Sequence, residues 1–221
     1  MRVLLAEDAP ALAESLLRVL RHEGFVVDHA DRGDRADYWL RTERYDAVVL
    51  DLGLPVQDGL SLLRGWREDA LRVPVLILTA RGRWPEKAAG FAAGADDYVT
   101  KPFEPMEVVA RLHALIRRAH GQTQSQLMLG PVTIDAARAE VLEGGQPVVL
   151  TAQEFKLLHH LALSANRVVT RTALRDHLYP RDSDPDSNVI DVLVSRMRRK
   201  FRHPLIETVR GQGFMVRDGA P

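Results

Sequence analysis

The chain has 221 residues, no cysteine, and 30 basic against 30 acidic side chains. The absence of cysteine excludes disulfides, thiolate nucleophiles and cysteine-ligated zinc, and the balanced charge does not by itself indicate a nucleic-acid partner. The length suits two small domains, because domains typically have about 100 to 150 residues. No apolar run is long enough to span a bilayer, and Glu7 and Asp8 interrupt the N-terminus before a signal-peptide core could form. We therefore expect a cytoplasmic protein without membrane contact.

The first half of the sequence alternates short apolar runs with amphipathic segments. The runs predicted as strands are Val3–Ala6, Val26–Asp28, Ala47–Leu50, Val75–Leu78 and Ala95–Val99. The segments predicted as helices are Pro10–Glu23, Arg32–Arg44, Leu60–Glu68, Trp84–Ala93 and Glu104–Ala119. Such alternation is typical of a parallel sheet with crossover helices, and strands that are apolar at consecutive positions are covered on both faces. The prediction for residues 1–120 is an α/β domain with five strands and five helices.

A second domain is predicted over residues 127–221, after a polar linker at residues 121–126. The predicted strands are Val132–Asp135, Ala139–Leu142, Pro147–Val149, Ile206–Val209 and Phe214–Val216. Thr151 and Glu154 have the spacing of a capping box, which opens a helix to about Ala165. Two further helices are predicted, the first capped by Thr170 and running to Leu178, and the second from about Ser187 to Phe201. A small sheet, three helices and a terminal hairpin together describe an α+β winged helix-turn-helix domain.

Polar side chains stand directly after four of the strands predicted in the first half. They are Glu7 and Asp8 after the first strand, Asp51 after the third, Thr79 after the fourth and Lys101 after the fifth. Ligands of an open parallel sheet bind at the carboxyl ends of its strands, so we expect these groups to meet at one edge. Clustered carboxylates favour Mg²⁺, with Asp8 and Asp51 as direct ligands. An aspartate can also attack phosphorus, and the set predicts phosphorylation of Asp51 with Lys101 as a neutralising cation.

Each of these residues also has an ordinary structural explanation. Asp8 could start the helix ahead of Pro10, Thr79 could cap the next helix, and Lys101 could be a surface lysine. Taken singly, these explanations are favoured over a functional role. Taken together, five such groups at one edge favour a phosphoryl-transfer site.

These motifs resemble the receiver domain of bacterial two-component response regulators. The resemblance is carried by Glu7-Asp8, Asp51-Leu-Gly-Leu-Pro55, Asp58-Gly59, Thr79-Ala80, and Gly94-Ala-Asp-Asp-Tyr-Val-Thr-Lys101-Pro102-Phe103. It implies a flavodoxin-like, doubly wound sheet and phosphotransfer from a sensor histidine kinase to Asp51. It also implies Mg²⁺ held by the acid pair, Asp51 and the backbone carbonyl of Gly53. Thr79 and Lys101 would then sense the phosphate.

The same resemblance implies that Tyr98 turns inward with Thr79 on phosphorylation, although a plain core aromatic explains Tyr98 equally well. It also implies a cis peptide bond between Lys101 and Pro102. The segment Arg81-Gly-Arg-Trp-Pro85 departs from the family pattern and leaves the start of the fourth helix open. Gly53 and Arg81 stand where receivers tune phosphate lifetime, which the sequence does not reveal.

A set of charges of both signs follows in the last third of the predicted receiver domain: Lys87, Asp96, Asp97, Glu107, Arg111 and Arg118. As exposed charges they would contribute little, because a surface ion pair is worth about 0 to 1 kcal/mol. In regulators of the OmpR/PhoB type, however, matching charges pair across a two-fold receiver dimer that phosphorylation favours. Either Arg117 or Arg118 could take the last role. The resemblance therefore implies a homodimer.

The last predicted helix has an apolar and a basic face. A rotation of about 100° per residue puts Ile190, Leu193, Val194, Met197 and Phe201 on the core side. Outward positions are held by Asn188, Ser195, Arg196 and Arg199, with Arg198 and Lys200 on the flanks. Helix-turn-helix proteins place such a helix in the major groove, where arginine can read guanine. We expect Arg196 to contact bases and Arg198 and Arg199 to hold phosphates, unless the basic cluster is only a solvated helix face.

The final strand–turn–strand segment resembles the wing of the same family, with Thr208 and Arg210 near DNA. The whole resemblance runs from Arg2 to Val216 and implies a transcription factor that binds promoter DNA, expected as direct repeats, and RNA polymerase. The chain would catalyse only its own phosphorylation and dephosphorylation. One alternative is an aspartate-nucleophile phosphatase, although the second acid of that class would fall at Gly53. Another is a signalling adaptor whose second domain binds protein instead of DNA.

Overall fold

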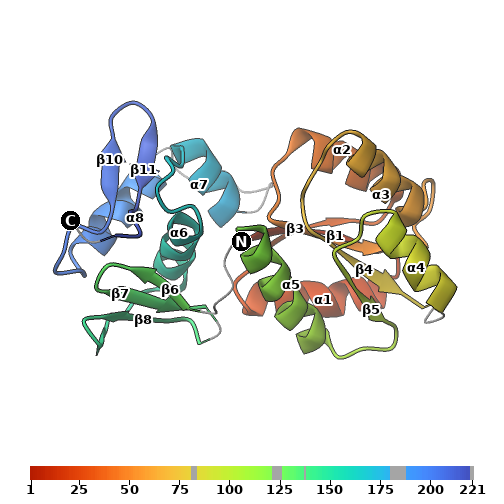
Figure 1. The fold of residues 1–221 in the computed structure, drawn as a ribbon, viewed down its shortest axis with the longest axis horizontal. Helices are drawn as coiled ribbons and strands as arrows, with labels where there is room; N and C mark the ends of the chain where they lie inside the picture. The colour runs from red at the N-terminus through yellow and green to blue at the C-terminus, as the bar shows by residue number, and fades with distance from the viewer. Residues whose placement is uncertain (81–83, 121–125, 137, 180–187, 220–221) are drawn as a thin grey trace. The chain divides into compact units, whose positions relative to one another are not determined.

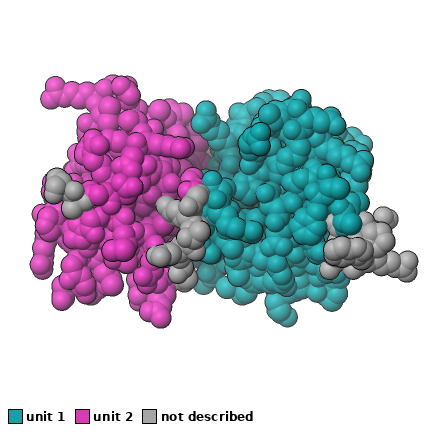
Figure 2. All heavy atoms as spheres, in the orientation of Figure 1, with its two compact units in different colours: residues 1–119 teal, residues 120–221 magenta. Residues whose placement is uncertain are grey.

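The computed structural model describes residues 1–80, 84–120, 126–136, 138–179 and 188–219. The chain forms two compact units, Met1–Ala119 and His120–Pro221, which Figure 2 colours separately. Residues 121–125 of the predicted linker lie outside the described residues, and Gln126 begins a strand instead of ending the linker. Within the described ranges, no helix combines the length and the apolar character that a membrane span requires.

The first unit is an α/β sandwich around a parallel sheet with the strand order β2-β1-β3-β4-β5. Its strands are β1 (Arg2–Ala6), β2 (Val26–Ala30), β3 (Ala47–Asp51), β4 (Val75–Thr79) and β5 (Asp97–Thr100). Its helices are α1 (Pro10–His22), α2 (Gly33–Thr42), α3 (Gly59–Glu68), α4 (Trp84–Ala92) and α5 (Pro105–Ala119). Figure 1 shows α1 and α5 on one face of the sheet, and α2, α3 and α4 on the other. This strand order is the flavodoxin-like one, as predicted.

The three central strands, β1, β3 and β4, are largely apolar, which suits strands in the middle of a covered sheet. Every residue of β1, β3 and β4 is buried, which fits apolar runs that helices cover on both faces. Trp66 on α3 is fully buried beneath these strands, and its indole N–H donates to Asp37 Oδ1 of α2 at 2.8 Å. The fifth strand starts at Asp97, two residues later than predicted, because the Ala95 N–H still closes the end of α4 by donating to the Gly90 carbonyl.

The second unit consists of a four-stranded antiparallel sheet, three helices and a terminal hairpin. The sheet holds β6 (Gln126–Leu129), β7 (Val132–Asp135), β8 (Glu140–Glu143) and β9 (Gln146–Pro147), in that order. The helices are α6 (Ala152–Leu163), α7 (Arg171–Leu178) and α8 (Val189–Arg198), and the hairpin pairs β10 (Glu207–Val209) with β11 (Gly213–Met215). The sequence analysis missed β6, because four residues with two inward side chains give too short an alternation to distinguish from a polar loop.

The predicted helix caps are present. In the capping box of α6, the Thr151 N–H donates to Glu154 Oε2 at 2.7 Å, and the Glu154 N–H donates to Thr151 Oγ1 at 3.3 Å. Thr170 caps α7 by accepting from the Ala173 N–H at 3.1 Å. Each cap satisfies a backbone donor that the first helical turn leaves unpaired.

The last helix is shorter than predicted. Asn188 is its N-cap and Arg199 its C-cap, and Ser187 lies outside the described residues. Beyond the cap, the Glu143 carboxylate accepts from the Arg202 N–H at 3.0 Å and from the His203 N–H at 3.0 to 3.1 Å. The charged acceptor offers these backbone donors an alternative to the helical ladder, so the chain turns here.

The hairpin is fixed to the start of α7. Val169 and Phe214 exchange two backbone hydrogen bonds, of 2.8 and 2.9 Å. Gly213 has a φ of +157°, and a Cβ at this position would collide with the Val169 carbonyl. Only glycine permits this close approach, which sets the hairpin beside the helix pair α7 and α8.

Candidate functional site

Three carboxylates meet at the carboxyl edge of the parallel sheet in the first unit. Asp51 ends β3, and Glu7 and Asp8 follow β1, so that carboxylate oxygens of all three lie within 4.8 Å of one another. Glu7 is fully buried, Asp51 is nearly so, and Asp8 is exposed. Three carboxylates share one ammonium here, and the excess of negative charge fits a hard divalent cation such as Mg²⁺.

Lys101 supplies the positive charge of this site from the end of β5. Its Nζ donates to Glu7 Oε2 at 2.8 Å and lies 3.3 Å from Asp51 Oδ1. Burial raises the pKa of Glu7, against the lowering effect of the Lys101 hydrogen bond. Burial works to lower the pKa of Lys101, but the hydrogen bond to Glu7 and the charge of Asp51 raise it overall. The ammonium therefore stays charged and bridges the two acids.

The remaining predicted receiver residues lie on the neighbouring strands. Thr79 is the last residue of β4 and is buried, and its carbonyl accepts from the Lys101 N–H at 2.8 Å. A Cβ placed on Gly53 would be 3.5 Å from Asp51 Oδ2, so the Gly53 backbone runs beside that carboxylate. The Lys101–Pro102 peptide is cis, which agrees with the family pattern.

Tyr98 on β5 is half-buried and stands edge-on to Phe91 of α4. The two ring centroids are 4.9 Å apart and the planes are inclined at 61°. This contact places Tyr98 between the sheet and α4, next to the elements that carry the mixed charges. The sequence analysis left the start of α4 open; the structure describes this helix from Trp84, and residues 81–83 lie outside the described residues.

Four of the six mixed-sign charges belong to two separate ion-pair groups of the first unit. Arg111 bridges Asp97, at 2.9 Å, and Glu107, at 2.8 Å, so β5 and α5 share one ion-pair chain. The pKa of Arg111 is raised by its hydrogen bonds to Glu107 and then to Asp97. Asp96 pairs instead with Arg67 of α3, at 3.0 Å, a residue that the sequence analysis did not select.

The last two charged residues of the set are Arg118 and Lys87, and the structure describes the side chain of Arg118 alone. Arg118 near the end of α5 is exposed, and its Nε donates to the Ala114 carbonyl at 3.4 Å. Lys87 belongs to α4, but its side chain lies outside the described residues.

The outer face of α8 is mostly polar and basic, as predicted, although Val192 is also exposed there. Ile190, Leu193, Val194, Met197 and Phe201 are all buried. Ser195 and Arg196 are exposed on the helix, and Asn188 and Arg199 are exposed at its two ends. Within the described part of the chain, the guanidinium groups of Arg196, Arg199 and Arg210 have no protein acceptor. Three cations are therefore available to an external anion.

Arg198 is bound inside its own domain. Its Nε and Nη2 donate to the Ile206 carbonyl at 3.1 and 2.7 Å, and Nη2 also donates to Thr208 Oγ1 at 2.7 Å. Arg198 and Thr208, which the sequence analysis assigned to DNA contacts, thus bind each other. Their contact connects α8 to β10. Lys200 is similarly bound, because its Nζ lies 2.6 Å from Glu154 Oε2.

The sequence analysis missed Arg171, the first residue of α7. Its guanidinium donates to both oxygens of Asp191 on α8 at 2.8 Å, and it lies over the Phe214 ring at 4.6 Å from the centroid. One side chain thereby joins the helix pair to the hairpin. The only local signal is an arginine directly after a helix cap, which is too common to indicate a partner 20 residues away.

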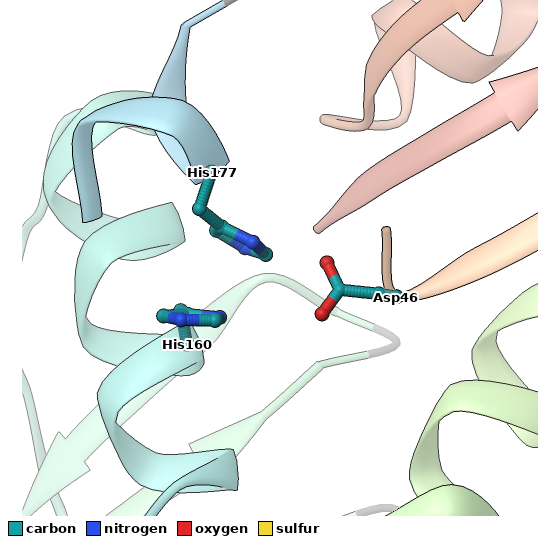
Figure 3. Close-up of side chains that lie close together, drawn as sticks. All are labelled: Asp46, His160 and His177. Carbon is teal, nitrogen blue, oxygen red and sulfur yellow. The ribbon is translucent and has the colours of Figure 1, made fainter. Parts of the chain in front are cut away.

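Two histidines link the other helix pair of the second unit. His160 of α6 and His177 of α7 stack with ring centroids 3.6 Å apart and planes inclined at 30° (Figure 3). Asp46, also labelled there, belongs to the first unit. The stacked rings help to hold α6 against α7 and so support the helix-turn-helix frame.

Comparisons with known proteins assign each half of the chain to a protein family. A family model described as "Response regulator receiver domain" matches residues 3–113, and one described as "Transcriptional regulatory protein, C terminal" matches residues 145–216. The "Two-component response regulator PhoP" of Pseudomonas aeruginosa is 44% identical over 219 residues and 97% of each chain. The "Transcriptional regulatory protein PmrA" of Pectobacterium parmentieri is 41% identical over 99% of each chain.

Solved structures agree for the receiver half. A Francisella response-regulator receiver domain aligns with a TM-score of 0.52 and 34% identity, covering 53% of this chain and 98% of the other. A putative response regulator from Chloroflexus aurantiacus gives 0.51 and 39%, with the same coverage. Each half matches a family model, and relatives match nearly the whole chain, so the chain belongs to the OmpR/PhoB-type two-component response regulators and is a transcription factor with a receiver domain and a DNA-binding domain.

Proposed function

We propose that Asp51 accepts a phosphoryl group from a sensor histidine kinase in a Mg²⁺-dependent reaction, and that this promotes receiver dimerisation and sequence-specific binding to promoter DNA in the cytoplasm. The observation that carries the proposal is the cluster of Glu7, Asp8 and Asp51 with the Lys101 ammonium between two of its carboxylates. A cluster of this composition combines a nucleophile, a cation site and a fixed positive charge.

In the proposed transfer, an Asp51 carboxylate oxygen attacks the phosphorus of a phosphohistidine. The P–N bond breaks, the imidazole leaves with its electron pair, and an acyl phosphate forms on Asp51. Asp8, Asp51 and the Gly53 carbonyl would hold Mg²⁺, with Glu7 beside them. When bound there, Mg²⁺ would supply charge neutralisation for the transferred group. The Lys101 ammonium would contact the phosphate oxygens from its place beside the carboxylates, and the Thr79 hydroxyl would donate to the phosphate.

The surroundings of Asp51 support a phosphoacceptor more than a phosphatase. A hydrolase of the aspartate-nucleophile class requires a second acid two residues after the nucleophile, and Gly53 stands there. The proposed chemistry is therefore limited to the chain's own phosphorylation and dephosphorylation. The family of the second half favours DNA over a protein partner, and contact with RNA polymerase at promoters with direct repeats belongs to the same proposal.

Replacing Asp51 by Asn tests the phosphoacceptor directly. We expect Asp51→Asn to abolish Mg²⁺-dependent labelling by a small phosphodonor such as acetyl phosphate, read as acid-labile phosphate after gel separation. The matched control is Asp58→Asn in the same loop, because Asp58 caps α3 through the Ser61 N–H and Asn caps a helix equally well. Undiminished acid-labile phosphate in Asp51→Asn would remove Asp51 from the proposed role.

The exposed cations of the second unit support the DNA part of the proposal. Ser195 and Arg196 lie on the outer face of α8, and helix-turn-helix proteins insert this face into the major groove. Arg199 follows the helix and Arg210 lies between the strands of the hairpin. In this proposal Arg196 reads bases, whereas Arg199 and Arg210 hold phosphates or line a groove.

A further inference from the structure

Arg67 at the end of α3 is held by three acceptors from different parts of the receiver. Its Nε donates to the Gly94 carbonyl at 2.9 Å, its Nη1 to the Leu71 carbonyl at 2.7 Å, and its Nη2 to Asp96 Oδ2 at 3.0 Å. A guanidinium presents its donors in a fixed plane, so three acceptors leave it one orientation. Arg67 therefore joins the end of α3 to the turn between α4 and β5.

Gly94 makes room for this arrangement. Its φ of +98° favours glycine, and a Cβ there would lie 2.7 Å from Arg67 Cγ and 3.0 Å from Nε. Any larger residue would push the arginine side chain away from the turn. The backbone at Gly94 thus leaves space for the Arg67 side chain. The contact between Arg67 and Asp96 therefore depends on the fold, unlike an ion pair between two mobile surface side chains.

Asp96 uses only one of its oxygens in this contact. Oδ2 accepts from Arg67 and also from the Val75 N–H at 2.8 Å. Among the residues that the structure describes, Oδ1 has no donor, and 44% of the side chain is exposed. The carboxylate is therefore anchored through one oxygen and presents the other to solvent, one residue before the Asp97–Arg111–Glu107 ion-pair chain.

From this geometry we infer that Arg67 is a positioning residue for receiver dimerisation. It fixes Asp96 so that Oδ1 faces a cation of a second copy of the chain, for which the exposed Arg118 has the right charge. The inference rests on the dimerisation proposed above and adds a residue outside the interface charges to it. Anchoring the acceptor in advance removes most of the ordering cost that an exposed ion pair otherwise incurs.

Two roles of Arg67 predict opposite results. If Arg67 orients Asp96, its removal weakens the dimer. If Arg67 only neutralises the charge of Asp96, removing Arg67 leaves the Asp96 carboxylate uncompensated. The carboxylate then attracts the cation of the second copy more strongly, and the dimer becomes tighter. Lysine keeps the charge but lacks the planar fork, so Arg67→Lys should resemble Arg67→Gln in the first case and the wild type in the second.

The experiment is sedimentation analysis of the full chain, saturated with Mg²⁺ and beryllofluoride as a phosphoryl mimic. We expect Arg67→Gln and Arg67→Lys each to raise the dimer dissociation constant about tenfold, because a two-fold interface contains the contact twice. The control is Arg64→Gln, which removes an exposed arginine of the same helix and should leave the constant unchanged. Acetyl phosphate labelling of each variant confirms an intact Asp51 site.

A mutant cycle with Asp96 provides the decisive comparison. In an Asp96→Asn background, Arg67→Gln should cause no further weakening. Continued weakening in that background, an unchanged dimer in Arg67→Gln, or a tighter dimer would each overturn the inference while leaving phosphorylation-dependent dimerisation intact. A wild-type chain that stays monomeric with beryllofluoride would overturn the proposed dimerisation and this inference with it.

Discussion

Arg196 and Arg198 lie two positions apart on α8, yet their side chains have different surroundings. Arg196 points to solvent without a protein acceptor among the described residues, whereas Arg198 binds the Ile206 carbonyl and Thr208. We expect Arg196→Ala to lose about 1 to 3 kcal/mol of discrimination between an operator and random duplex, because a bidentate arginine–guanine contact is worth that much. Competition binding with both duplexes measures the ratio. A ratio equal to that of the wild type would mean that Arg196 does not read a base.

Replacing Arg198 should act first on stability. Arg198→Ala leaves the nearly buried Ile206 carbonyl without its charged donor, and we expect the free energy of unfolding to fall by about 1 to 2 kcal/mol. Urea unfolding measures the loss, with Arg196→Ala as the surface control, for which we expect a change within about 0.5 kcal/mol. Equal stability of the two variants would contradict the structural role of Arg198.

The sequence predicted residues at the edge of the receiver sheet far better than individual roles on α8. The positions of Glu7, Asp51 and Lys101 follow from where apolar runs end, and strand ends of a parallel sheet must meet. The bond between Arg198 and the Ile206 carbonyl depends on how the hairpin packs against α8. No local pattern encodes such a tertiary contact.

Among the elements, the capping box of α6 allows a clean test. Thr151→Ala removes the hydroxyl that accepts from the Glu154 N–H, and we expect it to cost about 1 kcal/mol of stability. Thr151→Ser retains an accepting hydroxyl at the same backbone position and should stay close to the wild type. Thermal unfolding of the two variants separates the cap from general effects of substitution. If alanine and serine were equivalent, the hydroxyl would have no capping role.

The bounds of elements with strong local signals were predicted to within about two residues. The bounds of elements without such signals were predicted less well. The buried strands β3 and β4 and the capped helices α6 and α7 combine hydrophobic pattern with end signals. The end of α8 was placed too late, because its apolar stripe continues to Phe201 although the helix ends at Arg198. Beyond that end, the Arg202 N–H donates to the carboxylate of Glu143, 59 positions away, instead of to a helical carbonyl.

At the scale of the whole receiver, one half-buried histidine predicts acid sensitivity. Burial, together with the charge of the N-terminus, lowers the pKa of His113 from 6.5 to about 4. The unfolded chain binds a proton at this residue at a higher pH than the folded one does. Stability is therefore unaffected above pH 6.5 and falls as the pH decreases toward 4, by up to about 3 kcal/mol.

Urea unfolding as a function of pH measures this loss. The control is His113→Gln, because glutamine has no group that titrates in this pH range. The substitution also removes part of the ring contact with Phe25, but that loss does not depend on pH. We expect the difference in unfolding free energy between wild type and variant to shrink as the pH falls from 6.5 to 4. A constant difference over this range would mean that His113 protonates equally in both states.

For the whole chain, the proposed coupling of the two units through dimerisation predicts a change in the salt dependence of DNA binding. In the proposed complex each copy contacts DNA through the exposed residues Arg196, Arg199 and Arg210. The logarithm of the binding constant falls with the logarithm of the salt concentration in proportion to the number of phosphates neutralised. If phosphorylation places two copies on a direct repeat, the slope should become about twice as steep. Titrating duplex DNA at several salt concentrations, with and without beryllofluoride, measures both slopes.

The Asp51→Asn variant should keep the shallow slope under both conditions, since it cannot bind the phosphoryl mimic. A half-site duplex should likewise keep the shallow slope with the wild type, because it has room for one copy. Equal slopes on the direct repeat, with the affinity still raised by beryllofluoride, would mean that phosphorylation improves the contacts of a single copy. Dimerisation through the charges around Asp96 and Arg111 would then not be the route from Asp51 to DNA.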